Sequence, residues 1–363
     1  MRNLLVTSQD LRASPRQNRK SSAEADQKPR NNIFRKAMCK PKIQPLSVSR
    51  QIGPDDGIFR IPPYDKAPVP QQPGRINLNL AMPGVHSSWR QLNGRGVKIA
   101  VLDSGADINH PALRANIKEV ANFTDGAINS DVRDEEGHGT MVAGVIAARS
   151  SSIIGIAPES ELYIGKVIKQ NTGGTVGNLR AGIEWARRKG VDIINISLGA
   201  SQDVDVIHQE IRAARANPDK DIFVICAAGN DGTSGGLEYP ARYDECIAVG
   251  AVTRNRNRWE LSSTGHELDI VAIGHQVRST FPRDKDSSGE SVRSGTSLAA
   301  PFVTGVLGLA LAKHKLLGGD TEIRNYRNVL GHLLRTTIDL GPVGPDPEFG
   351  FGLIDQERFL AEV

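Results

Sequence analysis

The feature that most constrains the fold is a series of short apolar runs separated by segments with helical periodicity. The runs are nearly continuous in Val, Ile and Ala, which is typical of parallel strands buried on both faces. They span residues 97–102, 162–167, 192–198, 222–227, 246–252 and 268–272. Apolar residues at helical spacing fill residues 176–188 and 203–216, and a third helix is expected to begin near Gly139. This alternation predicts an α/β fold with a mostly parallel central sheet.

Three regions of different composition divide the chain of 363 residues. Residues 1–50 are polar, lack sustained periodicity and hold 12 Lys and Arg against 3 Asp and Glu, so we interpret them as a basic, disordered leader. The alternative is an arm that binds nucleic acid or anionic lipid. Residues 51–79 are rich in proline and glycine, which favours a linker or an extended docking segment over a helix. Residues 80–363 carry the strand and helix patterns and are expected to form the folded domain.

Bulk composition restricts the setting in which the chain works. Hydrophobic residues make up 39% of the chain, enough for a sizeable core, and no apolar run reaches the roughly 18 residues that indicate a membrane span. The first ten residues lack the apolar stretch of a secretory signal. The three cysteines, Cys39, Cys226 and Cys246, show no metal-ligand spacing, and the last two lie in apolar runs. We therefore expect a reducing, cytoplasmic setting and no membrane partner, with export by another route left open.

Three short segments each place one chemically active residue where a strand or loop meets a turn or a helix start. They are 101–105, 137–140 and 295–301, and they hold Asp103, His138 and Ser297 in that order. A serine hydroxyl is a poor nucleophile at neutral pH, so it needs a histidine base, and the histidine needs a carboxylate to fix its tautomer. A fourth residue, Asn230, offers an amide donor for the charge that develops in acyl transfer.

Each of these residues also has an ordinary structural interpretation. Asp103 could simply begin a turn, His138 could belong to a glycine loop, and Ser297 could cap the apolar helix that is predicted after it, over 297–313. Taken singly, those interpretations are favoured. Their placement at strand ends and helix starts fits a shared site, because ligands of parallel sheets bind at the carboxyl ends of the strands. The preference reverses when their order and local sequences are compared with those of a known family.

The order Asp, His, Ser and the local sequences around it resemble the subtilisin-like serine peptidases, and most closely the intracellular subtilisins. The order is the one known for subtilisin itself. The resemblance runs from about residue 84 to 353, roughly three quarters of the chain, and includes stretches without a catalytic residue: 155–158, 162–163, 166–167, 182–186, 247–252 and 261–263. It implies a three-layer subtilisin-like fold, with helices flanking the sheet, in a catalytic domain of residues 80–363. It also implies a serine endopeptidase that works through an acyl-enzyme intermediate.

The resemblance assigns a role to each of four residues. Ser297 would attack the scissile carbonyl, and His138 would act as general base and then as general acid for the leaving amine. Asp103 would orient His138 and stabilise its cation. The side-chain amide of Asn230 and the backbone N–H of Ser297 would bind the oxyanion. No cofactor is needed for this chemistry.

The same resemblance predicts how a protein or peptide substrate is held. Ser197, Leu198 and Gly199 would offer one strand edge, and Gly173 and Gly174 would flank the substrate on the other side. A peptide between two such edges is bound mainly through main-chain hydrogen bonds, which depend little on its sequence.

One residue of the predicted substrate site departs from the family pattern. Glu238 precedes Tyr239 and Pro240, near the floor of the P1 pocket, where broad-specificity members carry a small residue. A carboxylate there would favour Lys or Arg at P1. The preceding loop, 231–237, is shorter than usual, which leaves the alignment with the family open at this position. The alternative is that Glu238 is a surface loop residue.

The calcium site of the best-known members is a second departure. In those proteins an Asp soon after the catalytic Asp and a loop after the His helix hold the ion, whereas this chain has Ala112 at the first position. Its loop 149–153 is short and has no carboxylate. We expect the high-affinity calcium site to be missing and assign no residue as a metal ligand. Weaker calcium sites are left open.

Residues 61–64, Ile-Pro-Pro-Tyr, are similar to an element in the short N-terminal extensions of intracellular subtilisins. In those relatives the extension lies across the cleft and makes the chain a zymogen. Proline removes a backbone donor and restricts the residue before it, which would hinder cleavage. We therefore predict self-inhibition by residues 51–79, the alternative being a plain proline-rich linker.

Two rival functions fit parts of the sequence. A pseudopeptidase could bind a partner through the same cleft, but the intact set of Asp103, His138, Asn230 and Ser297 argues against it. A nucleic-acid-associated protein could use the basic arm, and removing the arm would then abolish salt-sensitive binding. We favour the active endopeptidase and expect no nucleic-acid partner.

Overall fold

The structure is a computed structural model that describes residues 57–62, 65–67, 92–170, 172–216, 221–318 and 326–362. All of them belong to one compact unit, residues 47–363. Outside the described residues lie the predictions made for residues 1–50 and for most of 51–79, including Tyr64. Within 51–79 the structure describes only 57–62 and 65–67.

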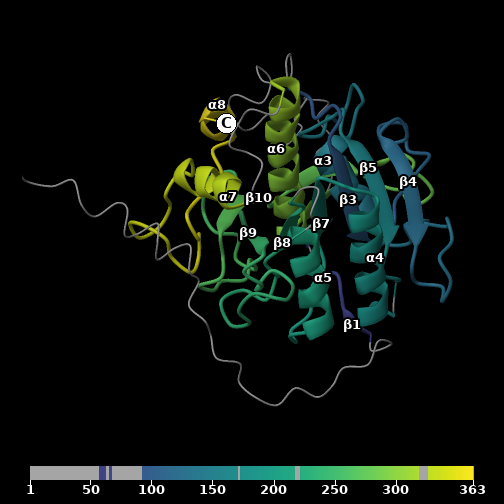
Figure 1. Cartoon of the computed structure of the whole chain (residues 1–363), viewed down its shortest axis with the longest axis horizontal. Helices are drawn as coiled ribbons and strands as arrows, with labels where there is room; N and C mark the ends of the chain where they lie inside the picture. Colours follow the sequence, from purple (N-terminus) through teal and green to yellow (C-terminus); the bar gives the residue numbers. More distant parts are fainter. Residues whose placement is uncertain are drawn as a thin grey trace, which may run out of the picture. The chain divides into compact units, whose positions relative to one another are not determined.

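A seven-stranded sheet forms the middle of this unit (Figure 1). Its spatial order is β10-β9-β8-β7-β3-β5-β4, and every neighbouring pair is parallel. The strands are β3 (Lys98–Asp103), β4 (Ile117–Asn122), β5 (Glu161–Lys166), β7 (Ile193–Ile196), β8 (Phe223–Ala227), β9 (Cys246–Val252) and β10 (Ile270–Ile273). The first of these strands in the chain, β3, lies inside the sheet, and later strands extend the sheet on both sides of it. Ligands of such open sheets bind at the carboxyl ends of the strands beside this change of direction.

Six of the seven strands coincide with the predicted apolar runs, and the predicted α/β fold with a mostly parallel sheet is confirmed. The strand that the sequence did not predict, β4, lies at the edge of the sheet. Its residues are Ile-Lys-Glu-Val-Ala-Asn, and only the last two are buried. An edge strand of this kind needs no continuous apolar run, so it left no signal in the sequence.

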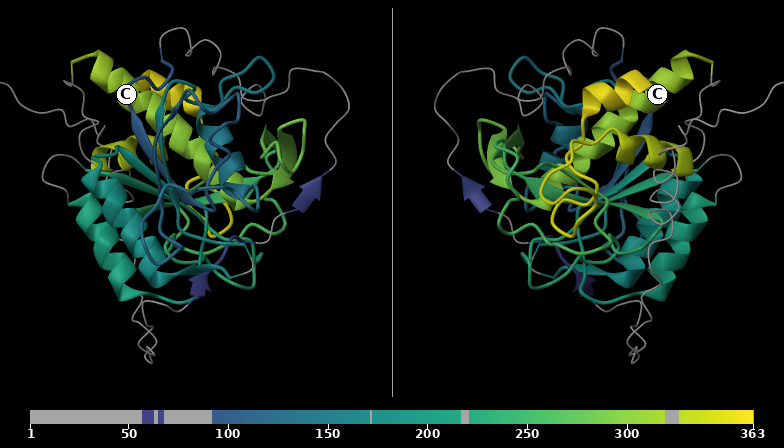
Figure 2. Two further views of the ribbon diagram at one scale, coloured as in Figure 1. Left: turned by 90° about the vertical axis from the view of Figure 1, so that its right-hand side faces the viewer. Right: turned by 90° about the vertical axis from the view of Figure 1, so that its left-hand side faces the viewer.

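Helices cover both faces of the sheet, which gives three layers (Figure 2). On one face, α4 (Val176–Arg188) packs beside α5 (Asp205–Arg215); on the other, α3 (His138–Ala147) packs beside α6 (Thr296–Leu316). The shorter α7 (Tyr326–Arg335) and α8 (Gln356–Glu362) follow α6, and α8 contacts α6 and α7. The bounds of α4 match the prediction. The helix begins at Val176 because the side chain of Thr175 caps its N-terminus by accepting from Asn178 N at 3.1 Å.

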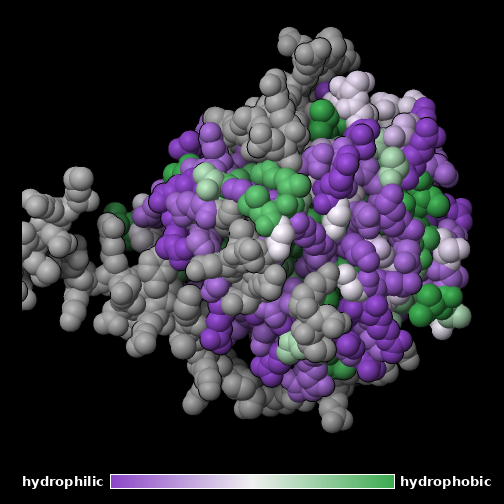
Figure 3. Space-filling view, turned by 45° about the horizontal axis from the view of Figure 1, so that its top comes forward, coloured by the Kyte–Doolittle hydropathy of each residue, from purple (hydrophilic) through white to green (hydrophobic). Residues whose placement is uncertain are grey.

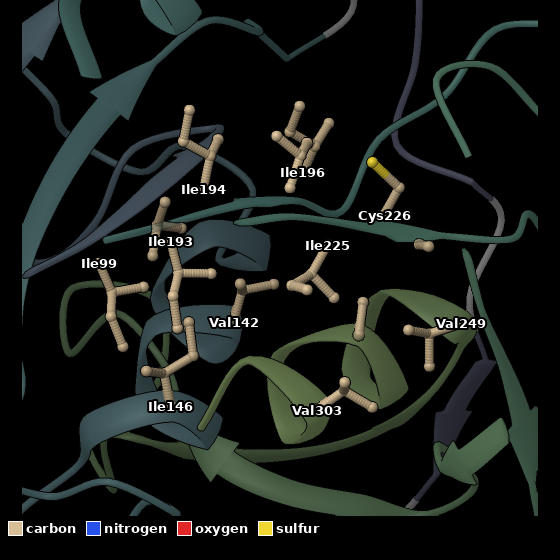
Figure 4. Close-up of a cluster of buried hydrophobic side chains, with 14 of the residues drawn as sticks. Ile99, Val142, Ile146, Ile193, Ile194, Ile196, Ile225, Cys226, Val249 and Val303 are labelled. Carbon is tan, nitrogen blue, oxygen red and sulfur yellow. The ribbon is translucent and has the colours of Figure 1, made fainter. Parts of the chain in front are cut away.

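The core lies on both sides of the sheet, as the continuous apolar runs require. Adjacent residues of a strand point to opposite faces, and Figure 4 shows this for Ile193 and Ile194. The strand side chains on the face of α3 and α6 meet apolar residues of those helices, Val142, Ile146 and Val303. Ile196 and Cys226 point to the other face and are fully buried.

Two small antiparallel sheets lie outside the central one. One consists of β11 (Val277–Thr280), β12 (Glu290–Ser294) and β2 (Asp65–Ala67), in that order. The other pairs β1 (Gly57–Phe59) with β6 (Gly174–Thr175). Both sheets therefore attach part of the proline-rich N-terminal region to the folded domain.

The length and apolar composition of α6 would suffice to cross a membrane, but 94% of its most apolar stretch is buried inside the protein, as in the core helix of a globular domain. It is longer than the predicted helix 297–313 and begins one residue earlier. On the face of the molecule drawn in Figure 3, hydrophilic residues predominate and hydrophobic residues form only small separate groups.

Candidate active site

The predicted catalytic residues meet at the carboxyl edge of the central sheet. Asp103 is the last residue of β3, Ser197 follows β7 directly, and Asn230 follows β8 after a short turn. The first turns of α3 and α6 carry His138 and Ser297. Hydrogen bonds join these helix starts to the strand ends, His138 to Asp103, Ser297 to Ser197 and Thr296 to Asn230. The five residues come from distant parts of the chain and all lie at this edge of the sheet.

Asp103 and His138 form a short buried hydrogen bond. The distance from His138 Nδ1 to Asp103 Oδ1 is 2.7 Å, and the two residues are 3% and 0% exposed. The same carboxylate oxygen accepts from Ser104 N at 2.7 Å. A buried carboxylate is stable only with such donors. Because Nδ1 donates its proton to Asp103, Nε2 is the nitrogen that can act as a base.

The environment of His138 favours its protonated form. Burial alone would lower the pKa of the imidazole, but the charge and hydrogen bond of Asp103 oppose this, and the charges of Asp134 and Glu136 add to the effect. The net result is a raised pKa. An imidazolium that forms during a reaction would therefore be stabilised in place.

Two glycines allow His138 to approach Asp103 so closely. Gly137, the N-cap of α3, has a φ of 86°, in the left-handed region that favours glycine. A Cβ on Gly139 would lie 2.1 Å from Gly105 O and 3.2 Å from Asp103 Cβ. Any side chain at Gly139 would push α3 away from the end of β3.

Ser297 is the second residue of α6 and is buried. Its Oγ donates to Ser197 O at 3.2 Å, and Ser197 Oγ donates to Ser297 O at 3.0 Å. These two bonds fix the start of α6 on the end of β7. The hydroxyl lies at the positive end of a helix dipole, where negative charge is stabilised.

Asn230 is fixed by its carbonyl end. Its Oδ1 accepts from Thr296 N at 3.0 Å and from Thr296 Oγ1 at 2.8 Å. The hydroxyl of Thr296 also contacts the backbone of Gly229, which precedes Asn230 and has a φ of 109°. This arrangement sets the orientation of the amide, so that its Nδ2 is the donor end that faces away from Thr296.

The two predicted substrate edges lie on either side of the chain's own residues 57–60. β1 pairs antiparallel with β6, with Phe59 opposite Gly174. On the other side, Arg60 N donates to Gly199 O and Gly199 N donates to Arg60 O, both at 2.9 Å. A Cβ on Gly173 would lie 2.8 Å from Phe59 O, so glycine is needed for a peptide to approach this edge. We call Gly173–Thr175, Ser197–Gly199 and Glu238 the strand site.

Glu238 is a buried residue of the strand site rather than a surface loop residue. Its side chain is 3% exposed and is packed against two glycines: a Cβ on Gly199 would lie 2.2 Å from Glu238 Oε2, and one on Gly229 would lie 2.9 Å from its Cγ. Its Oε1 accepts from the Arg60 guanidinium at 3.2 Å. Burial raises the pKa of Glu238, although Arg60 partly opposes this. The carboxylate can thus receive a cationic side chain from the strand beside it.

Ala112 and the loop 149–153, the positions that correspond to the calcium site of the best-known relatives, lie side by side. Ala112 O accepts from Arg149 N at 2.7 Å, at the start of the loop 149–153. Among the described residues, no group of three or more His, Cys, Asp or Glu side chains is arranged to hold a metal ion. The calcium expectation therefore stays a prediction.

Three residues of the site were missed by sequence reasoning. Ser104 and Asp134 form a buried hydrogen bond of 2.8 Å beside Asp103 and His138. Arg60 reaches both Glu238 and the more exposed Asp231. The position of Asp134, three residues before Gly137, was a signal for a cap at the start of α3. The contact between Arg60 and Glu238 joins residues 178 apart in the chain, so it had no local signal.

Comparison with known proteins gives a family match across most of the folded domain. A sequence model described as the subtilase family, Peptidase_S8, matches residues 94–352. The chain is 39% identical over 289 residues to a protein named intracellular serine protease from Paenibacillus polymyxa, which covers 77% of this chain and 85% of that protein.

Two subtilisins are similar over nearly their full length. Subtilisin Savinase from Lederbergia lenta is 39% identical over 277 residues, covering 76% of this chain and 94% of that protein. Subtilisin DY from Bacillus licheniformis is 38% identical over 269 residues, covering 73% of this chain and 90% of that protein.

Proposed function

The chain belongs to the subtilase family and is a serine-type endopeptidase, and we propose that Asp103, His138 and Ser297 are its catalytic triad. The observation that carries this proposal is the buried 2.7 Å bond between His138 Nδ1 and Asp103 Oδ1 at the sheet edge where α6 presents Ser297. Substrates of this activity are proteins or peptides.

In the proposed mechanism, His138 Nε2 removes the proton of Ser297 Oγ while the oxygen attacks the scissile carbonyl carbon. The new C–O bond places a negative charge on the former carbonyl oxygen. Collapse of this intermediate breaks the C–N bond, and the proton passes from His138 to the leaving amine. Water then attacks the acyl-enzyme by the same route and releases Ser297. Asp103 stays ionised throughout and stabilises the imidazolium.

We also propose that Asn230 Nδ2 and the backbone N–H of Ser297 bind the oxyanion. The contacts of Asn230 Oδ1 with Thr296 support this, because they hold the amide in one orientation before any substrate arrives. Preorganised donors act on the charge that develops in the transition state without having to reorient.

Kinetics of two variants test the triad. Ser297→Ala and His138→Ala should each lower kcat for a peptide substrate about a million-fold, the size of effect known for subtilisin. Because the residues act as a unit, the double variant should lose little more than either single one. Additive losses, or a kcat of Ser297→Ala within tenfold of the unchanged chain, would show that the triad is assigned wrongly.

For substrate binding, we propose that a peptide occupies the strand site as the middle strand between Gly174 and Gly199. The backbone bonds that residues 57–60 make there support the proposal. We further propose that Glu238 favours Lys or Arg at P1. Its support is the contact of its buried carboxylate with the guanidinium of Arg60, a basic side chain that stands beside the site.

We propose that the N-terminal extension, residues 51–79, inhibits the enzyme, and that its residues 57–60 do so by occupying the substrate site. Three contacts support this: β1 pairs with β6, Arg60 pairs with Gly199, and β2 pairs with β12, the strand directly before Gly295 and Ser297. The described segments thus contact the domain on the strand site and next to the proposed nucleophile. Pro62, between them, is buried and cannot donate a backbone hydrogen bond.

Two deletions separate self-inhibition from a general effect of the N-terminal region. Removing residues 1–75 should raise kcat/KM for a short peptide at least tenfold, whereas removing only residues 1–46 should leave it unchanged. Thermal melting of both variants checks that the domain stays folded. If the longer deletion leaves activity unchanged while the domain stays folded, the inhibitory role fails.

We propose a cytoplasmic location. The similar protein from Paenibacillus polymyxa is named as intracellular, which supports this. Fractionation of the producing cells tests it, since the protein should be recovered with a cytoplasmic marker enzyme. Recovery mainly from the culture medium without cell lysis would contradict the proposal.

A further inference from the structure

Asp134 carries a buried carboxylate that neither the proposed triad nor the strand site uses. The residue is 2% exposed. Its Oδ1 accepts from Ser104 Oγ at 2.8 Å, Gly137 N at 2.8 Å and Glu136 N at 3.2 Å. Its Oδ2 accepts from Thr140 N at 2.8 Å and Thr140 Oγ1 at 2.6 Å. Donors on both oxygens hold the carboxylate in one orientation.

These bonds cap the helix that carries His138. The first N–H groups of a helix have no partner within the helix, and a side chain at the N-cap usually accepts from the third residue. The N-cap of α3 is Gly137, which has no side chain to do this. Asp134 takes its place by binding Thr140 N, the third residue of α3, and Gly137 N itself. His138 therefore lies between two residues that Asp134 holds.

Asp134 is also connected to Asp103, through Ser104. The Ser104 Oγ lies 2.8 Å from Asp134 Oδ1 and 3.2 Å from Asp103 Oδ1, and it accepts from Gly139 N at 2.9 Å. A hydroxyl has a single proton, so the shorter distance favours donation to Asp134. Ser104 meanwhile binds Asp103 Oδ1 through its backbone N–H at 2.7 Å.

We propose that Asp134 is a positioning residue for the reaction. It holds Asp103 through Ser104 and His138 through the turn 137–140, and it adds a second negative charge near the imidazole. The proposal rests on the triad assigned above. Asp134 touches no reacting atom in this scheme. It acts by fixing the geometry of His138 and by stabilising the imidazolium that forms in the transition state.

Several charged groups surround this part of the site. The carboxylates of Asp103, Asp134 and Glu136 all act to raise the pKa of His138, against the effect of burial. On the strand side, Lys166 Nζ donates to Arg133 O at 2.6 Å and lies 3.8 Å from Glu135. Of the carboxylates of Asp134 and Glu136, only that of Asp134 binds Ser104 and the turn.

The test follows the second-order rate constant for labelling of Ser297 by a small fluorophosphonate, measured against pH on the full chain. The reaction needs neutral His138, so its rate falls as pH drops through the pKa of that residue. Asp134→Asn should lower the high-pH plateau about 10- to 100-fold, because an amide cannot accept on both sides. Losing the charge should also move the acid limb to lower pH by a few tenths of a unit or more.

Glu136→Gln is the matched control, since it removes a neighbouring carboxylate charge without touching the turn. It should move the acid limb in the same direction and leave the plateau within about twofold. A plateau loss as large as that of Asp134→Asn would overturn the positioning role. So would an Asp134→Asn variant with an unmoved acid limb, or one that labels like the unchanged chain. Absence of labelling at Ser297 both in the unchanged chain and in the chain that lacks residues 1–75 would instead refute the triad itself.

A second pair of variants keeps the proposal testable if Asp134→Asn melts below the assay temperature. Ser104→Ala removes the hydroxyl that joins Asp134 to Asp103 but leaves every charge in place. It should lower the plateau several-fold, and Ser104→Thr, which retains a hydroxyl, should restore most of it. A Ser104→Ala variant that keeps the full plateau would show that the connection contributes nothing.

Discussion

The cluster around Asp103 and His138 and the strand site lie next to each other but are held by different kinds of interaction. In the cluster, buried side chains bind one another and the backbone through bonds such as Asp103–His138 and Ser104–Asp134. In the strand site, contacts to the occupying segment are main-chain bonds at β6 and Gly199, with the ion pair of Glu238 and Arg60 beside them. The first arrangement depends on particular side chains, whereas the second, as the proposed substrate site, would accept many peptides.

This difference separates chemistry from selectivity. The cluster needs particular side chains at fixed distances, and a change there should remove activity toward every substrate. Main-chain bonds are available to any peptide, so at the proposed substrate site a side chain such as Glu238 would have to supply the selectivity.

Asn230→Ala should lower kcat about 100- to 1,000-fold with little change in KM, as known for the oxyanion-hole asparagine of subtilisin itself. The loss should be the same for P1 Arg and P1 Leu peptides, because the oxyanion is common to both. Steady-state kinetics with matched peptides, after a count of active sites by labelling, measure it. A loss that differs strongly between the two peptides would place Asn230 in substrate selection instead.

Glu238→Gln should change selectivity and leave the chemistry intact. A hydrogen bond to a charged group is worth about 1.5–3 kcal/mol, so kcat/KM for a P1 Arg peptide should fall about 10- to 100-fold. In the chain that lacks residues 1–75, and therefore Arg60, which contacts Glu238 in the full chain, the value for a P1 Leu peptide should change little.

Asp231→Asn is the control for Glu238, because Asp231 is the other carboxylate near Arg60 but is 38% exposed. Solvent screening should keep its effect on the Arg-to-Leu ratio within a few-fold. A chain with an unchanged Glu238 that prefers P1 Leu over P1 Arg would refute the role of this carboxylate.

Calcium removal should have the smallest effect, since we propose that Ala112 and the loop 149–153 provide no tight site. A tight site would contribute several kcal/mol at saturating calcium, because a ligand bound only to the folded state stabilises it. Thermal melting in excess chelator should therefore give the same midpoint as melting in calcium, to within about 2 °C. A large drop that added calcium reverses would show that a strong site exists, and a calcium-dependent subtilisin run in parallel validates the assay.

The parts of the fold that could be predicted are those with a local pattern. Continuous apolar runs marked strands such as β8 and β9, and the capping residue Thr175 accounts for the start of α4. β4, at the sheet edge, was not predicted because most of its residues are partly exposed. β11 and β12, in a separate antiparallel sheet, are largely buried but contain polar residues, so they form no continuous apolar run.

The site shows the same limit. Asp103, His138, Asn230 and Ser297 were recognisable because each lies in a short motif at the end of an element. Asp134 binds Ser104 thirty residues before it, and Arg60 binds Glu238 across 178 residues. Such contacts depend on how the strands and helices are assembled, so no spacing in the sequence could have revealed them.

The residue that a fluorophosphonate modifies identifies the nucleophile of a serine peptidase directly. The full chain is incubated with the probe and digested, and mass spectrometry identifies the labelled peptide and the N-terminal residue of the chain. We predict one adduct, on Ser297, that is absent from Ser297→Ala and strongly slowed in His138→Ala. An adduct on another serine, or labelling that persists in Ser297→Ala, would contradict the assignment of the nucleophile.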